Sequence, residues 1–178
     1  MNYIQNIDYE ILMFIQNHIK NPFFDWVMPI ITSLGNMGIL WIIIGMIFLL
    51  RKNERKIGIK IIVALVLCAI IGNIILKNVF MRTRPFDIYN TIEILIKKPL
   101  DFSFPSGHTM TSVAAATILL IEKKEKGILF MFIAFAIAFS RLYLFVHYPS
   151  DVFIGATLGI LIAIISVKLI NWLWIKIR

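Results

Sequence analysis

Long apolar segments run through most of this chain. Hydrophobic residues make up 60% of its 178 residues, and charged residues only 16%. A soluble domain of this length could not enclose so many apolar side chains in one core, so the surplus has to face lipid. A membrane-spanning helix needs about 20 mostly apolar residues, and these segments approach that length: 27–50, 57–76, 107–121, 127–146 and 152–174. The sequence therefore predicts an all-α fold, a polytopic transmembrane helical bundle with five spans.

The N-terminal region leaves open whether there is a sixth span. Pro29 and residues 32–36 are expected to break the first apolar segment, so that its continuous span begins near Asn36. Ahead of it, residues 7–19 place apolar side chains near one helical face. That spacing predicts an amphipathic helix lying in the membrane interface. A sixth, broken span within residues 9–31 is the alternative.

The charge of the chain fits a membrane protein. The formal net charge is +8, which in a soluble protein would suggest a nucleic-acid partner. Here the basic residues fall between apolar segments, where membrane topology accounts for them, and we expect no nucleic-acid partner. No polar linker divides the chain, so we expect residues 1–178 to form a single membrane-embedded domain.

Basic residues are shared unequally between the two sides that five spans would create. Cytoplasmic loops carry an excess of Lys and Arg, so the side with eleven basic residues is predicted to be cytoplasmic. The loops 77–104 and 141–151 then face the extracellular or periplasmic side of the cell membrane. The eleven are Arg51, Lys52, Arg55, Lys56, Lys60, Lys123, Lys124, Lys126, Lys168, Lys176 and Arg178, and the opposing six are Lys77, Arg82, Arg84, Lys97, Lys98 and Arg141.

The first of three polar motifs lies at the exit of the second apolar segment. It reads Lys77-Asn-Val-Phe-Met-Arg-Thr-Arg84-Pro85. Two cations separated by about two helical turns can converge on one anion if the helix ends between them. The alternative is that both residues only anchor the end of a helix.

The second motif, Pro105-Ser106-Gly107-His108, directly precedes the third apolar segment. Ser is a favourable N-cap residue, and Gly lets a ligand approach the backbone closely. Free N–H groups and the positive dipole end at the start of a helix bind phosphate readily. The motif therefore predicts a phosphate-binding helix start with His108 beside the anion. A capping role alone is the alternative for Ser106.

The third motif spans residues 140–151, with Arg141, His147 and Asp151 at a span boundary. Such residues are costly in a membrane unless they pair or bind something. The spacing lets the Asp151 carboxylate hold one nitrogen of His147 while the other nitrogen faces a substrate, as in histidines that act as base or nucleophile. A structural His–Asp pair capping the last span is the alternative.

Together the three motifs resemble those of the type 2 phosphatidic acid phosphatase superfamily, which are Lys-x6-Arg-Pro, Pro-Ser-Gly-His and Ser-Arg-x5-His-x3-Asp. The chain matches every specified position in order, and the resemblance covers about residues 57–169. It implies an α-helical enzyme that cleaves phosphate monoesters or diphosphates without a metal ion. One departure is that residues 7–24 replace the first full span of many relatives, which bears on the helix count and not on the chemistry.

The resemblance also implies a role for each motif residue. His147 would attack phosphorus, Asp151 would orient His147, and His108 would protonate the leaving oxygen and then activate water. The groups that would bind the phosphoryl oxygens are Lys77, Arg84, Ser106, Gly107 and Arg141. Cations and helix-start amides can offset the charge on these oxygens without Mg²⁺, so we expect no metal ion and no cofactor. The loop acids Asp87, Glu93 and Asp101 are interpreted as solvated charges.

A site at the membrane surface of a chain with almost no soluble part favours a lipid phosphate or diphosphate as substrate. An outward-facing site indicates a polyprenyl diphosphate carrier, such as undecaprenyl diphosphate hydrolysed to the monophosphate. Phosphatidylglycerophosphate and phosphatidic acid are alternatives, because the motif residues recognise the phosphate group and not the lipid chain. A transporter or a headgroup binder without catalysis is the competing class. His108 and His147 argue against it, since binding alone needs only cations.

Overall fold

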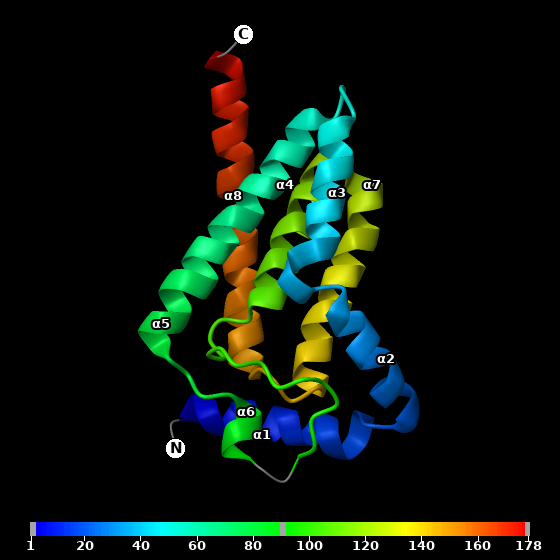
Figure 1. Cartoon of the computed structure of the whole chain (residues 1–178), viewed down its shortest axis with the longest axis vertical. Helices are drawn as coiled ribbons and strands as arrows, with labels where there is room; N and C mark the ends of the chain where they lie inside the picture. Colours follow the sequence, from blue (N-terminus) through cyan, green and yellow to red (C-terminus); the bar gives the residue numbers. More distant parts are fainter. Residues whose placement is uncertain (1–2, 90–91, 177–178) are drawn as a thin grey trace.

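The computed structural model describes residues 3–89 and 92–176, and the regular structure in that part of the chain is entirely helical (Figure 1). The prediction of an all-α fold is therefore confirmed. Three segments are long and apolar enough to cross a membrane: Arg55–Ile88, Gly107–Tyr143 and Pro149–Lys176. The bent pair Pro22–Ser33 and Asn36–Leu50 would add a fourth. The chain is a multi-pass membrane protein, and five spans remain a prediction.

The first apolar segment is broken where the sequence predicted. Helix α2 (Pro22–Ser33) and the segment Asn36–Leu50 are bent by 43°. Helix α3 proper (Ile39–Leu50) follows a 3₁₀ turn. Two successive residues there have left-handed backbones, Met37 with φ of 51° and Gly38 with φ of 68°. The break therefore interrupts the helix inside the apolar segment, beside the polar residue Asn36.

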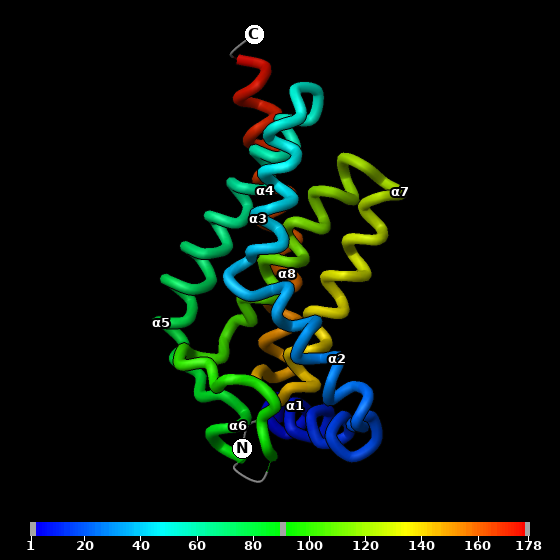
Figure 2. The backbone as a smooth tube through the Cα atoms, turned by 45° about the vertical axis from the view of Figure 1, so that its right-hand side comes forward, coloured from blue at the N-terminus to red at the C-terminus, as the bar shows by residue number. Residues whose placement is uncertain are grey.

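Helix α7 (Gly107–Tyr143) doubles back on itself (Figure 2). The reversal is at Lys124, whose φ is 30°, between the third and fourth apolar segments of the sequence. A Cβ atom on Gly127 would lie 2.3 Å from the Cα atom of Leu120. Only glycine at that position lets the two limbs approach so closely.

The two limbs of α7 pack with α3, α4 (Arg55–Cys68) and α8 (Pro149–Lys176) around the main core. A π-helical stretch (Ala69–Leu76) and the short α5 (Lys77–Phe80) continue α4. Glycines set the distance between α7 and α8: a Cβ atom on Gly155 would lie 2.8 Å from the carbonyl oxygen of Ser106. The start of α7 is thereby held against the first turns of α8.

Helix α1 (Tyr3–Phe14) lies across one end of the bundle, followed by a π-helical turn (Ile15–Ile19) (Figure 1). Its apolar side chains Tyr3, Ile4 and Phe14 are exposed, while Asp8 and Leu12 are buried against the bundle. A second apolar cluster, including Leu12 and Phe145, seats α1 against the α7–α8 corner and the short α6 (Pro85–Ile88). The helical segment predicted at residues 7–19 is thus present and covers one end of the bundle.

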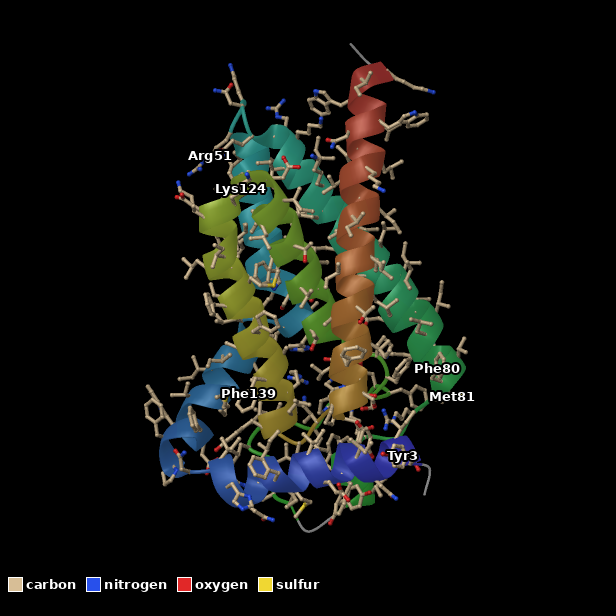
Figure 3. All side chains as sticks on the ribbon, turned by 180° about the vertical axis from the view of Figure 1, so that it is seen from behind. Tyr3, Arg51, Phe80, Met81, Lys124 and Phe139 are labelled. Atoms are coloured by element: carbon tan, nitrogen blue, oxygen red, sulfur yellow. The ribbon has the colours of Figure 1, made fainter. Side chains whose placement is uncertain are left out.

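The basic connections and the motif-bearing loops lie at opposite ends of the molecule. Figure 3 shows Arg51 and Lys124 at one end, and Tyr3 and Met81 at the other. This matches the alternation of ends expected from the sequence. Arg178, which was counted with the first group, lies outside the described residues.

Candidate active site

Most of the predicted site residues converge on one cavity of about 930 Å³ at the α1 end of the bundle. Six of the eight line it: Lys77, Arg84, Gly107, His108, Arg141 and His147. The other two, Ser106 and Asp151, are fully buried behind this lining. Residues brought together from the three motifs therefore share one space.

His147 lies in the corner between α7 and α8, where the backbone turns sharply. Phe145 has a φ of 59°, and the Val146 N–H donates to the Arg141 carbonyl at 3.2 Å. Pro149 then opens α8, since its fixed φ suits the first position of a helix. The corner leaves His147 1% exposed at the cavity wall.

The two nitrogens of His147 have different surroundings. Nδ1 lies 3.6 Å from Oδ2 of Asp151, with the Ser103 hydroxyl 3.5 Å from Nδ1 and donating to the same carboxylate oxygen. The Tyr148 N–H also donates to that oxygen at 3.0 Å. On the other side, Arg84 Nη1 is 3.2 Å from Nε2. The predicted His–Asp pair is present, with Ser103 beside it, a contact that the sequence did not indicate.

Burial lowers the pKa of His147 well below its ordinary value, and the nearby charges of Arg84, Arg141 and Lys77 lower it further. The imidazole is therefore neutral at physiological pH. With its proton on Nδ1, toward Ser103 and Asp151, the ring keeps a lone pair on Nε2, which accepts from Arg84. This is the protonation state that a nucleophilic histidine requires.

Lys77 and Arg84 converge because the helix ends between them, as predicted. Met81 has a φ of 42° and terminates α5, and the chain returns at Arg84. Carbonyl oxygens fix the guanidinium: Arg84 Nη1 donates to Val146 at 2.6 Å, and Nε donates to Asp101 at 2.8 Å. The backbone therefore sets the position of this cation.

Asp101 is bound by both of these cations, and its interpretation as a solvated loop charge is wrong. One carboxylate oxygen accepts from Lys77 and the other from Arg84, the latter at 2.7 Å. Burial alone would raise the pKa of this carboxyl, but Lys77 and Arg84 outweigh it and lower the pKa to about 2. The side chain is 55% exposed. A carboxylate thus lies between the two cations that were expected to bind a phosphate.

The start of α7 has the predicted geometry with one difference. Ser106 is the N-cap residue, but its hydroxyl pairs with the Thr109 hydroxyl at 2.9 Å and does not cap the backbone. Gly107 faces the cavity, and a Cβ atom there would lie 2.9 Å from Oδ1 of Asn73. Glycine at this position therefore lets the Asn73 side chain lie close against the first turn of α7.

His108 is held by the break between α2 and α3. Asn36 Oδ1 accepts from His108 Nε2 at 3.0 Å. A Cβ atom on Gly35 would lie 2.6 Å from Cδ2 of the imidazole. The break was predicted from the sequence, whereas the place of Asn36 in the site was not. The signal for it was a polar residue at a break within an apolar segment.

Arg141 is a buried cation with unused hydrogen-bonding capacity. Its Nη1 donates to the Thr32 hydroxyl at 2.5 Å, while its Nε has no partner in the described part of the chain. An unpartnered buried donor is costly. An anion in the adjoining cavity would satisfy both the charge and the donor.

The described residues include no group of three or more His, Cys, Asp or Glu side chains placed to hold a metal ion. Three cations, a helix start and two histidines lie together at this cavity. One histidine is backed by a carboxylate and the other by an amide. This arrangement can bind a phosphoryl group and offer it a nitrogen nucleophile.

Comparison with known proteins gives matches along nearly the whole chain. The sequence model of the PAP2 superfamily matches residues 57–175. An undecaprenyl-diphosphatase of Sulfolobus acidocaldarius is 34% identical over 167 residues, covering 93% of this chain and 80% of the relative. The structure is similar to a PAP2-type phosphatidylglycerolphosphate phosphatase of Bacillus subtilis, with a TM-score of 0.75, 28% identity and coverage of 100% and 89% of the two chains. It is also similar to Aquifex aeolicus LpxE, with a TM-score of 0.73, 29% identity and coverage of 91% and 95%.

Proposed function

This chain belongs to the PAP2 superfamily, and from that premise we propose that it hydrolyses a polyprenyl diphosphate to the monophosphate through a phosphohistidine on His147. It is a phosphoric ester hydrolase of membrane lipids. The observation that carries the proposal is a histidine backed by Asp151, with Nε2 beside Arg84 at the wall of a cavity that Lys77 and Arg141 also line.

In the first step, the lone pair on Nε2 of His147 attacks the terminal phosphorus. A P–N bond forms, the bond to the bridging oxygen breaks, and the lipid monophosphate leaves with the Nδ1 proton of His108, which enters this step as the imidazolium. Positive charge that develops on the imidazole is stabilised by Asp151. Lys77, Arg84 and the N–H groups at the start of α7 offset the charge on the equatorial oxygens.

In the second step, water attacks the phosphohistidine. His108, now without its proton, accepts one from the water, and the P–N bond breaks to release inorganic phosphate and neutral His147. Asn36 accepts from Nε2 of His108, which leaves Nδ1 as the nitrogen that exchanges protons with the substrate and the water. No step in this sequence requires a metal ion or a cofactor.

The apolar side of the cavity supports a lipid substrate. Ile42 of α3 and Val66 of α4 line it and are about half exposed on the bundle surface. An isoprenoid chain lying against these helices would enter from the bilayer, with its diphosphate directed toward Lys77. The similarity to the undecaprenyl-diphosphatase supports the polyprenyl substrate. The similarity to the phosphatidylglycerolphosphate phosphatase supports the phospholipid alternative.

The proposed site faces the extracellular or periplasmic side of the cell membrane. The basic connections lie at the opposite end of the molecule (Figure 3). Their excess of Lys and Arg favours the cytoplasm for that end. Such a site would act on carrier diphosphate released on the outer surface.

The test is phosphate release in detergent from a panel of substrates: undecaprenyl diphosphate, phosphatidylglycerophosphate and phosphatidic acid. We expect the highest kcat/KM with the diphosphate and none with any substrate for His147→Ala. A preference for phosphatidylglycerophosphate would replace the polyprenyl substrate. Full activity of His147→Ala on any member of the panel would refute the phosphohistidine mechanism.

A further inference from the structure

The buried carboxylate of Asp8 on α1 lies in a polar network outside the cavity. Asp8 is 2% exposed, although α1 is a helix at the end of the bundle. Its Oδ1 accepts from the Ser150 N–H at 2.8 Å, and its Oδ2 accepts from the Ser150 hydroxyl at 2.5 Å. The carboxylate therefore caps the first turn of α8 from another helix, which suits the positive end of the helix dipole.

Arg82 joins this carboxylate to the His147–Asp151 pair. Its Nη2 donates to Oδ2 of Asp8 at 2.7 Å, and its Nη1 donates to Oδ1 of Asp151 at 2.5 Å. The guanidinium carbon lies 3.9 Å from the ring centroid of Tyr148, which fixes its plane. Neither Asp8 nor Arg82 lines the cavity, so neither contacts the proposed phosphate position.

The two carboxylate oxygens of Asp151 thus have different partners. Oδ2 faces His147 and Ser103, while Oδ1 is held by Arg82. Because Asp151 is fully buried, a carboxylate released by Arg82 would lose its charged partner, and only the hydrogen bonds of Ser103 and Tyr148 to Oδ2 would still orient it toward Nδ1. Asp8 also sets the charge of the cluster. Two carboxylates around one guanidinium leave a net negative charge beside the imidazole that becomes positive.

We propose that Asp8 and Arg82 are positioning residues, through which the N-terminal helix α1 holds Asp151 in the orientation that His147 requires. The inference rests on the proposed phosphohistidine mechanism. It extends the catalytic apparatus to a helix that precedes residues 57–175, the part matched by the family. The packing of α1 on the bundle is then required for the correct orientation of His147.

The test uses Asp8→Asn and Arg82→Lys in the full-length protein in detergent. Lys keeps the charge but cannot bridge two carboxylates in the fork geometry of Arg. Partners that orient a functional histidine typically contribute about 10–100-fold to activity in metal sites, and we expect a loss of kcat of that order for both variants. KM should change little, because neither residue contacts the substrate. Asp25→Asn is the matched control, since Asp25 joins α2 to Tyr143 at 2.7 Å without touching the network.

A double-mutant cycle with Asp151→Asn separates positioning from a general loss of packing. If Asp8 acts through Asp151, then Asp8→Asn should cost little in the Asp151→Asn background, because coupled residues are not additive. Losses that multiply in the double variant, or a kcat for Asp8→Asn within twofold of Asp25→Asn, would overturn the inference. If Asp8→Asn does not fold, the same double-mutant cycle with Arg82→Lys and Asp151→Asn tests the inference.

Rapid quenching of the wild-type enzyme with substrate labelled in its terminal phosphate keeps the two proposals apart. Absence of label on His147 in the wild type would refute the proposed mechanism. Label on His147 at the wild-type rate in Asp8→Asn and Arg82→Lys would refute the positioning role and leave the mechanism standing. The expected result is label on His147 in all three proteins, formed about 10–100-fold more slowly in the variants.

Discussion

Replacing Asp101 by Asn should tighten the binding of inorganic phosphate. The Asp101 carboxylate lies between Lys77 and Arg84, where the proposed mechanism places a phosphate, so an incoming phosphate has to displace it. Arg84 should stay in place in the variant, because it is also held by the carbonyl oxygens of Val146 and of residue 101 itself. The substitution therefore removes a competitor and leaves the cations where they are.

The magnitude follows from the strength of these ion pairs. The pKa of the Asp101 carboxyl falls from 3.8 to about 2, and one pKa unit corresponds to about 1.4 kcal/mol. Because the side chain is 55% exposed, water screens the pairs, and the net contribution is reduced to about 1 kcal/mol. We expect the inhibition constant of inorganic phosphate to fall about fivefold in Asp101→Asn.

The assay is inhibition of lipid phosphate release by inorganic phosphate, at several pH values between 5 and 8. The effect should be constant over this range, because the carboxylate is ionised throughout. Glu93→Gln is the control, since Glu93 is an exposed carboxylate of the same loop. An inhibition constant that rises in Asp101→Asn would show that the carboxylate helps to build the phosphate site, and the displacement argument would be wrong.

The same pairs also make a pH-dependent contribution to stability. A carboxyl whose pKa is lower in the folded state stabilises the protein above its unfolded pKa, and that contribution is lost as the pH falls toward the folded pKa. The wild type should therefore exceed Asp101→Asn by about 1 kcal/mol in free energy of unfolding at neutral pH. The difference should shrink between about pH 4 and pH 2.

Three further predictions test the chemistry and the topology. Activity should survive EDTA, and a loss on chelation that Mg²⁺ or Zn²⁺ restores would remove the metal-free mechanism. His147→Ala should have no turnover, whereas His108→Ala should keep measurable activity, since general acid–base catalysis contributes about 10²–10⁴-fold. Phosphate label trapped on His108 of the wild-type enzyme would show that the roles of the two histidines are reversed. In a Cys68→Ala background, Lys97→Cys should react with a membrane-impermeant thiol reagent in intact cells and Lys52→Cys should not; the opposite pattern would invert the topology.

The convergence of the three motifs could be predicted because each lies at the end of an apolar segment. Lys77 and Arg84 flank a helix end, His108 follows a helix start, and His147 with Asp151 spans a helix junction. Helices that cross a bilayer alternate in direction, so alternate ends meet on one side. Spacing along the sequence therefore sufficed to place these residues in one cavity.

The contacts that support the motif residues could not be predicted in the same way. Ser103 reaches His147 from 44 positions away along the chain, and Asn36 reaches His108 from 72 positions away. Asp8 reaches Ser150, the neighbour of Asp151, from 142 positions away. Such contacts depend on how α1, the α2–α3 break and the long loop fold back over the bundle. The periodicity of apolar residues does not predict how these segments fold back. Asp101 was misinterpreted for the same reason, since its cations lie on another segment.

Residues with positive φ show where the backbone near the site is locally strained. Three residues with side chains and positive φ lie in the breaks around the cavity, namely Met37, Met81 and Phe145. A left-handed conformation costs a residue other than glycine about 1–2 kcal/mol. Each of these breaks brings a polar group to the phosphate position or to His108: Asn36, Arg84 and His147. Strain of this kind persists only where the surrounding structure enforces it. The fourth such residue in the described part of the chain, Lys124, lies at the opposite end of the molecule (Figure 3), where α7 reverses its direction.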